Sequence, residues 1–204
     1  LLGGLFAALT REEPGATEGG RNAIKELRAG IELLREVPGF RQFILARILL
    51  LIVTLSIPFY SFYGRSLTGG QVGDLGVFDI ASSAASILSS PVWGRFADRS
   101  SRTVMMVSAA VGALGGVVAL VLGAVPALET GALFAIVILL MGFAEAGINL
   151  GRKTYLVDGA PPGERPLYAA MANTILGVIT LASGALGLLQ QAIGIRALIA
   201  VFIA

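Results

Sequence analysis

Long apolar stretches separated by short polar ones dominate this chain. Each long stretch holds about 20 residues, which is the number that a helix rising ~1.5 Å per residue needs to cross a bilayer. The pattern predicts an all-α integral membrane protein with five complete spans and two truncated end spans. The complete spans are predicted at residues 44–63, 76–93, 104–126, 131–151 and 167–190, and the truncated ones at residues 1–9 and after Gly194.

Residues 10–43 form the only long polar segment. Within it, Ile24, Leu27, Ile31 and Leu34 recur at spacings of three and four, with charged residues between them. This periodicity predicts an amphipathic helix that ends at Pro38-Gly39. Such a helix could pack on a soluble partner or lie along the membrane surface beside the first span, and its position favours the surface.

Composition excludes most soluble classes of protein. The chain is 55% hydrophobic and 14% charged, whereas soluble domains carry about 25% charged residues. The hydrophobic composition indicates that the chain lies in a lipid bilayer. Because the net charge is only +2 and the basic residues lie in loops, we expect no nucleic-acid partner. It has no cysteine and no histidine, so we expect no metal site and no cofactor.

The basic residues alternate between the two sides of the predicted membrane. Segments 10–43, 94–103 and 152–166 carry 12 of the 15 Lys and Arg residues, while the opposite loop 64–75 carries only Arg65. Loops that stay in the cytoplasm collect Lys and Arg. We therefore expect a multi-pass protein of the plasma (cytoplasmic) membrane with these three segments on the cytoplasmic side.

The short basic loop 94–103 carries a recognisable motif. Gly94 is followed by Ala97-Asp98-Arg99 and by Arg102, and this order resembles the loop signature of the major facilitator superfamily (MFS), Gly-x-Leu-Ala-Asp-Arg-x-Gly-Arg-Lys. Here Phe96 replaces the leucine, Ser101 the second glycine and Thr103 the last basic residue. We expect the serine to be a strained substitution if the backbone there needs a positive φ.

The order of parts is similar to the second half of a twelve-helix MFS transporter. In this view residues 1–9 end span six, residues 10–43 are the cytoplasmic linker, and residues 44–204 are the C-terminal helical bundle. The resemblance implies a secondary transporter that moves a small-molecule substrate by alternating access, with a missing N-terminal six-helix half as its partner. The alternative is a facilitator-like membrane protein with a binding or assembly role and no transport.

An enzyme is not predicted. The run Gly147 to Thr154 looks like a phosphate-binding loop, but that motif requires four residues between its first glycine and Gly-Lys-Ser/Thr. Here three residues separate Gly147 from Gly151, and Arg152 precedes the lysine. No predicted strand comes before it, so we reject this reading.

The resemblance implies roles for particular residues. Gly94, Asp98, Arg99 and Arg102 would form a conformational-switch loop. The spans 44–63 and 131–151 would line the central cavity, with Ser56, Tyr60 and Asn149 as candidate cavity-lining residues. The aromatic group Phe59, Tyr60, Phe62 and Tyr63 fits either an interfacial belt or a substrate-facing surface, and Arg47 is expected to snorkel to the interface.

Glu145 is the only acid deep within a predicted complete span. An ionisable residue at that depth costs about 2.5–3.5 kcal/mol on insertion scales and is by default functional or paired. It could carry a proton in the cavity, close a charge relay with Asp98 and Arg102, or simply snorkel. The resemblance favours the relay.

Overall fold

The computed structural model describes residues 23–70, 72–161 and 163–203, and every element in these ranges is a helix. The predicted end span 1–9 and the first part of the linker lie outside the described residues. The helices are α2 (Ala23–Glu36), α3 (Pro38–Leu67), α4 (Val72–Ala97), α5 (Ser101–Leu122), the 3₁₀ helix η1 (Pro126–Leu128), α6 (Gly131–Gly159), α7 (Arg165–Ala182), α8 (Ala185–Ile193) and α9 (Ile195–Ile203).

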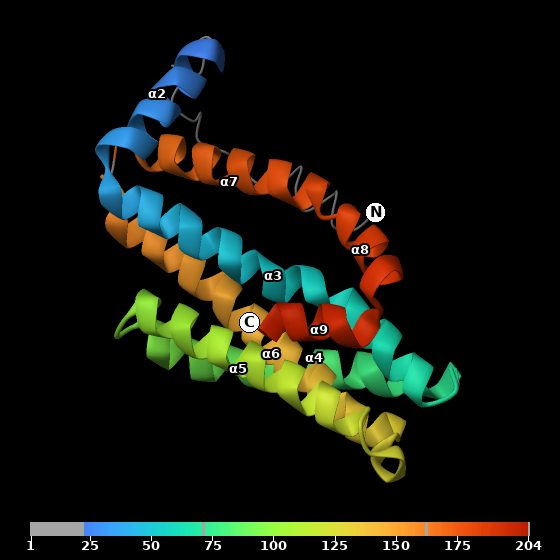
Figure 1. The fold of residues 1–204 in the computed structure, drawn as a ribbon. Helices are drawn as coiled ribbons and strands as arrows, with labels where there is room; N and C mark the ends of the chain where they lie inside the picture. The colour runs from blue at the N-terminus through green and yellow to red at the C-terminus, as the bar shows by residue number, and fades with distance from the viewer. Residues whose placement is uncertain (1–22, 71, 162, 204) are drawn as a thin grey trace, which may run out of the picture.

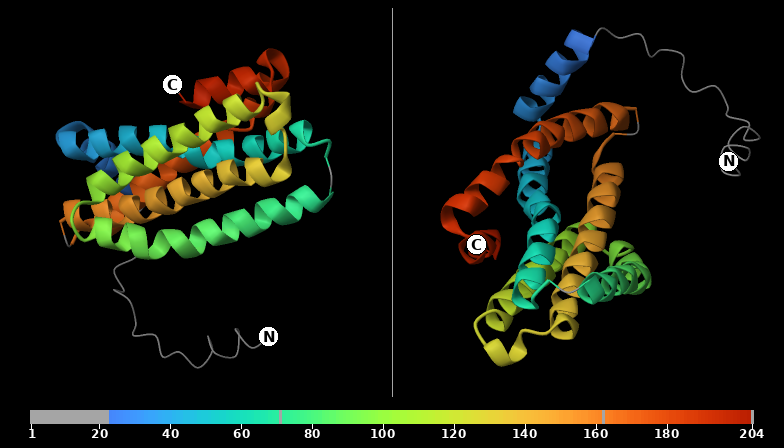
Figure 2. Two further views of the ribbon diagram at one scale, coloured as in Figure 1. Left: turned by 90° about the horizontal axis from the view of Figure 1, so that it is seen from below. Right: turned by 90° about the vertical axis from the view of Figure 1, so that its right-hand side faces the viewer.

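The long helices lie side by side in one bundle (Figure 1). Helix α6 packs against α3, α4, α5 and α7, while α9 packs on α3 and α5. Helix α2 and the bend between α4 and α5 lie at one end, which we call the bend end, and η1 lies at the opposite end (Figures 1 and 2). Four helices, α3 to α6, are long and apolar enough to cross a membrane, and α7 with α8 makes a fifth if the bent pair is one span.

Aromatic contacts fix how α3 is aligned with α6. At the bend end the rings of Phe43 and Tyr155 stack with centroids 4.8 Å apart, and at the opposite end Tyr63 meets Phe134 at 6.0 Å. The two helices are therefore antiparallel, and each step along α3 corresponds to one step back along α6. Arg47, one turn after Phe43, is consequently level with Gly151 and Arg152.

Glycines let α4, α5 and α6 approach closely. A Cβ atom on Gly147 would collide with the Ser108 hydroxyl of α5 and would lie 2.6 Å from Trp93 Cε2 of α4. The Trp93 indole N–H donates to the carbonyl oxygen of Phe143 at 2.8 Å, which ties α4 to α6. The segment that mimics a phosphate-binding loop is thus the helical interior of α6, and its glycines are there for packing.

The helices are longer than the predicted spans. Helix α3 begins at Pro38 instead of residue 44, α4 begins at Val72, and α6 continues to Gly159, well past residue 151. The predicted loops 64–75 and 152–166 are therefore mostly helical. A helix satisfies its own backbone hydrogen bonds outside the hydrocarbon core as well as inside it, so charged residues mark the edge of the membrane and not the end of a helix.

The fifth predicted span, 167–190, is broken. Helices α7 and α8 meet at 41° across Ser183 and Gly184. Glycine is a poor helix former and sharp bends occur at Gly/Ser pairs. A second break at Gly194, whose φ is +82°, turns the chain from α8 into α9, as the sequence predicted for the start of the last span.

Candidate functional site

The switch loop is shorter than the sequence predicted. Helix α4 continues to Ala97, Asp98 to Ser100 make the bend, and α5 begins at Ser101. The Ser100 side chain caps α5 by accepting from the Thr103 N–H at 3.3 Å. A serine at this position is the preferred kind of N-cap residue.

The expected strain at Ser101 is absent. Among the described residues positive φ values occur only at Gly69, Gly70 and Gly194, so the prediction that position 101 needs glycine is wrong. Ser101 is the first helical residue of α5, and its buried hydroxyl donates to the Asp158 carboxylate of α6 at 3.3 Å. The serine that replaces the family glycine thus links the bend to the end of α6.

The remaining switch residues lie at the surface of the bundle. Asp98, Arg99 and Arg102 are exposed, and Gly94 is a half-buried residue inside α4. A Cβ added at Gly94 would meet nothing within 4 Å. Nothing in the described bundle requires a glycine there, so a role for these residues depends on contacts with something outside it.

Glu145 lies far from the bend. Gly151 of α6 packs against Met105 and the Ser101 carbonyl, which places Arg102 level with residue 154, nine residues or about 13 Å from Glu145. Side chains on a helix tilt toward its N-terminus, and because α5 and α6 are antiparallel these two tilt apart. The predicted relay is not formed in this structure, and the acid of α6 that does meet the bend is Asp158, which sequence reasoning had placed in a loop.

Two of the three candidate cavity residues are packed in the core. Ser56 and Tyr60 are each 1% exposed. The Ser56 hydroxyl donates to the Val53 carbonyl at 2.8 Å, and Tyr60 lies against Gly116 of α5. Asn149 differs, because it is half-buried on α6 one turn after Glu145. A place for these side chains on a transport pathway stays a prediction.

Arg47 does not snorkel. Its side chain is only 6% exposed, and its Nε atom has no hydrogen-bond partner within the described part of the chain. The guanidinium carbon lies 5.6 Å from the centre of the Phe43 ring, and Arg152 is near enough to act on it electrostatically. Removing a charge from water costs several kcal/mol, and a hydrogen bond or an opposite charge at Arg47 would offset that cost.

Sequence reasoning had noticed Arg47 but passed over it. Its one signal was an isolated charge inside an apolar span. The features that matter, burial by α6 and a neighbouring Arg152, depend on how α3 and α6 are aligned, and Arg47 and Arg152 are more than a hundred residues apart in the chain.

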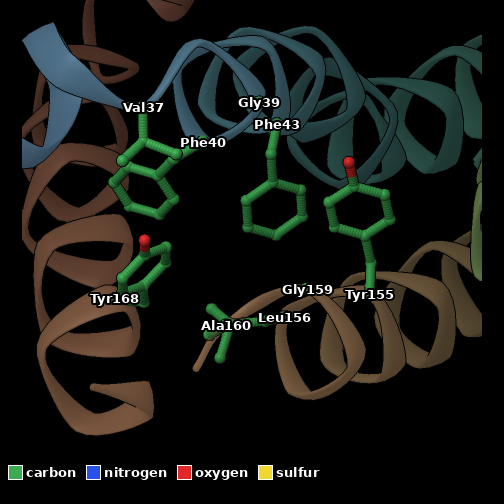
Figure 3. Close-up of a pocket in the computed structure, with 9 residues that line it drawn as sticks. All are labelled: Val37, Gly39, Phe40, Phe43, Tyr155, Leu156, Gly159, Ala160 and Tyr168. Atoms are coloured by element: carbon green, nitrogen blue, oxygen red, sulfur yellow. The ribbon is translucent and has the colours of Figure 1, made fainter. Parts of the chain in front are cut away.

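An aromatic pocket adjoins Arg47 at the bend end. It has a volume of about 110 Å³ and is lined by α3, α6 and α7. Figure 3 shows the rings of Phe40, Phe43, Tyr155 and Tyr168 around it. Phe40 and Tyr168 meet edge to face at 4.7 Å. The Phe43 ring lines this pocket and also contacts Arg47, so it separates the pocket from the buried charge.

A second polar cluster holds the opposite end together. Arg196, near the start of α9, donates from Nε to the Tyr63 hydroxyl at 3.1 Å and from a terminal nitrogen to the Gly123 carbonyl at 2.6 Å. These bonds join α9 to α3 and to the end of α5. Arg196 is therefore a connector of three helices.

Comparison with known proteins gives one match. The family model described as Major Facilitator Superfamily matches residues 42–204, which include all the helices from α3 to α9 except the first turn of α3. No curated protein and no solved structure matches the chain.

Proposed function

The chain belongs to the Major Facilitator Superfamily, and on this basis we propose that it forms the C-terminal half of a secondary transporter that moves a small solute by alternating access. The family match over residues 42–204 carries this proposal, since it covers four fifths of the 204 residues. The chain is a multi-pass membrane protein with at least four spans.

Polar chemistry inside the spans supports transport over a purely structural role. Helices α3 and α6 carry Arg47, Glu145, Asn149 and Arg152 within or at the edge of their apolar stretches. Charged residues at membrane depth are expensive to insert and mark substrate or ion pathways. A membrane anchor would gain nothing from them.

Exposed apolar faces support a second helical unit as partner. Ile80 and Ile87 of α4 are 71% and 73% exposed, and Leu181 and Leu188 near the break of α7 and α8 are 84% and 68% exposed. The small residues around Ala81 to Ser90 would let another helix approach α4 closely. We propose that a second six-helix half packs here, as alternating access between two repeats requires.

The proposed orientation follows from the basic residues. The bend end carries Arg95, Arg99 and Arg102 of the α4–α5 bend together with the basic residues of α2. We propose that this end faces the cytoplasm and that η1 faces outward, because retained loops carry the excess of Lys and Arg.

Two-sided accessibility tests the proposal. A cysteine replaces Asn149 in the full-length protein, and an impermeant thiol reagent is applied to right-side-out and to inverted vesicles. Alternating access predicts labelling from both sides. Ser100→Cys at the bend and Ala127→Cys in η1 are the controls, each expected to react from one side only, position 100 from the cytoplasm.

The rival function predicts a different pattern. A facilitator-like protein that binds or assembles without transport would expose position 149 to one side at most. Labelling of Asn149→Cys from a single side, with both controls behaving as expected, would contradict alternating access.

A further inference from the structure

We propose that Arg47 and Arg152 form a binding site for an oxyanion, a carboxylate or phosphate group, carried by the transported solute. The site lies between α3 and α6, in the part of the bundle near the bend end. This inference rests on the proposed transport function and adds to it the chemical class of the solute.

The first observation is the state of Arg47. It is 6% exposed, and its Nε has no partner among the described residues. Burial without a hydrogen bond is the costliest condition for a charged group. The ring of Phe43 at 5.6 Å offers a cation–π contact, which does not satisfy the buried Nε–H of the guanidinium.

The second observation is the position of Arg152. The stacking of Phe43 on Tyr155 aligns the helices so that Arg47 is level with Arg152, and the two arginines interact electrostatically. Like charges brought together inside a membrane protein repel one another unless an anion lies between them. Two guanidinium groups are the side chains best suited to bind a carboxylate or phosphate in a bidentate manner.

No acid in the described part of the chain satisfies Arg47, although Glu145 lies two turns before Arg152 on α6 and acts on that arginine electrostatically. Glu145 is level with Val53, six residues or about 9 Å along the axis from Arg47, and the two side chains tilt apart because α3 and α6 are antiparallel. Asp158 lies near the other end of the same stretch of α6, where it is exposed and accepts from Ser101. Arg47 and Arg152 together carry two positive charges, and Glu145 can balance only one of them. The site therefore has a net local charge of one positive unit.

Anion-dependent stabilisation tests the site. The full-length protein is placed in nanodiscs of phosphatidylcholine, and its melting temperature is measured with phosphate, sulfate, acetate or benzoate against chloride at equal ionic strength. We expect at least one oxyanion to raise the melting temperature. We expect Arg47→Gln to weaken that binding by about tenfold or more, since a charged hydrogen-bond donor is lost, and Arg47→Lys to weaken it less.

Arg41→Gln is the matched control, because Arg41 is an exposed arginine on the same helix. Each variant is compared with itself in chloride, so a general loss of stability does not imitate a loss of binding. The proposal is overturned if no oxyanion stabilises the wild type, or if Arg41→Gln and Arg47→Gln weaken binding equally.

A lipid headgroup is the other source of the same chemistry. Nanodiscs that contain phosphatidylglycerol, without added soluble anion, separate the two sources. Stabilisation by phosphatidylglycerol alone, removed by Arg47→Gln, would assign the site to lipid and overturn the solute proposal. Two-sided labelling of Asn149→Cys with no oxyanion binding would leave transport standing and reject only the substrate class. Oxyanion binding together with labelling of Asn149→Cys from one side only would leave the anion site standing and reject alternating access.

Discussion

Gly147 is the position where the packing of the bundle makes its sharpest prediction. It lies on α6 beneath Trp93 of α4 and Ser108 of α5, and an added Cβ would be 2.6 Å from Trp93 Cε2. Gly147→Ala should therefore force the three helices apart. Overpacking of this kind costs about 1–3 kcal/mol, and displacing the Trp93 indole from the Phe143 carbonyl costs about 1 kcal/mol more.

The comparison must separate packing from helix propensity. Gly76→Ala is the matched change, because Gly76 is an exposed helical residue of α4 whose added Cβ meets nothing within 4 Å. Both variants gain the same roughly 0.5–1 kcal/mol for replacing a helical glycine. The difference between them, about 2–4 kcal/mol, is the cost of the collision, and at about 2–4 °C per kcal/mol it should separate their melting temperatures by about 4 °C or more.

Thermal unfolding of the full-length protein in detergent measures this difference. Trp93, the one tryptophan of these 204 residues, is the fluorophore at this contact. Ser108→Ala removes the atom nearest the added Cβ. Because the Ser108 hydroxyl is buried without a partner in the described chain, that change alone should cost nothing, and in the double variant it should restore part of the loss. If Gly147→Ala and Gly76→Ala have the same melting temperature, the close approach of the three helices is refuted.

Three further outcomes are expected. Tyr63→Phe should lower the free energy of unfolding by about 1 kcal/mol, and Arg196→Ala should lower it by more, since the arginine makes both hydrogen bonds at the opposite end. Equal melting temperatures for these two variants in thermal unfolding scans would contradict this. Asp98→Asn should slow transport in proteoliposomes while equilibrium binding is kept, and a parallel loss of both would remove its gating role. The losses in free energy of unfolding caused by Glu145→Gln and by Arg102→Gln should add in the double variant to within about 0.5 kcal/mol, as they do for distant residues. A much smaller loss in the double variant than the sum of the two would support the relay between these residues.

The candidate site could be predicted in part. The motif around Asp98 identified the family and the position of the bend, because a local order of residues survives in the sequence whatever surrounds it. The partners of its charges could not be predicted. Asp158 reaches the bend, and Glu145 does not, only because α5 and α6 align so that Gly151 meets Met105. Neither spacing along one helix nor depth in a span contains that information.

The sequence by itself determined the class of the protein, the order of the four spans from α3 to α6 and the end at which its basic residues gather. These follow from the runs of apolar residues and the loops between them, which are properties of neighbours in the chain. Tertiary structure alone decided that Asp158 and not Glu145 meets the bend, and that Arg47 is buried near Arg152 instead of reaching the interface. The physical reason is that burial and charge pairing depend on which faces of distant helices meet.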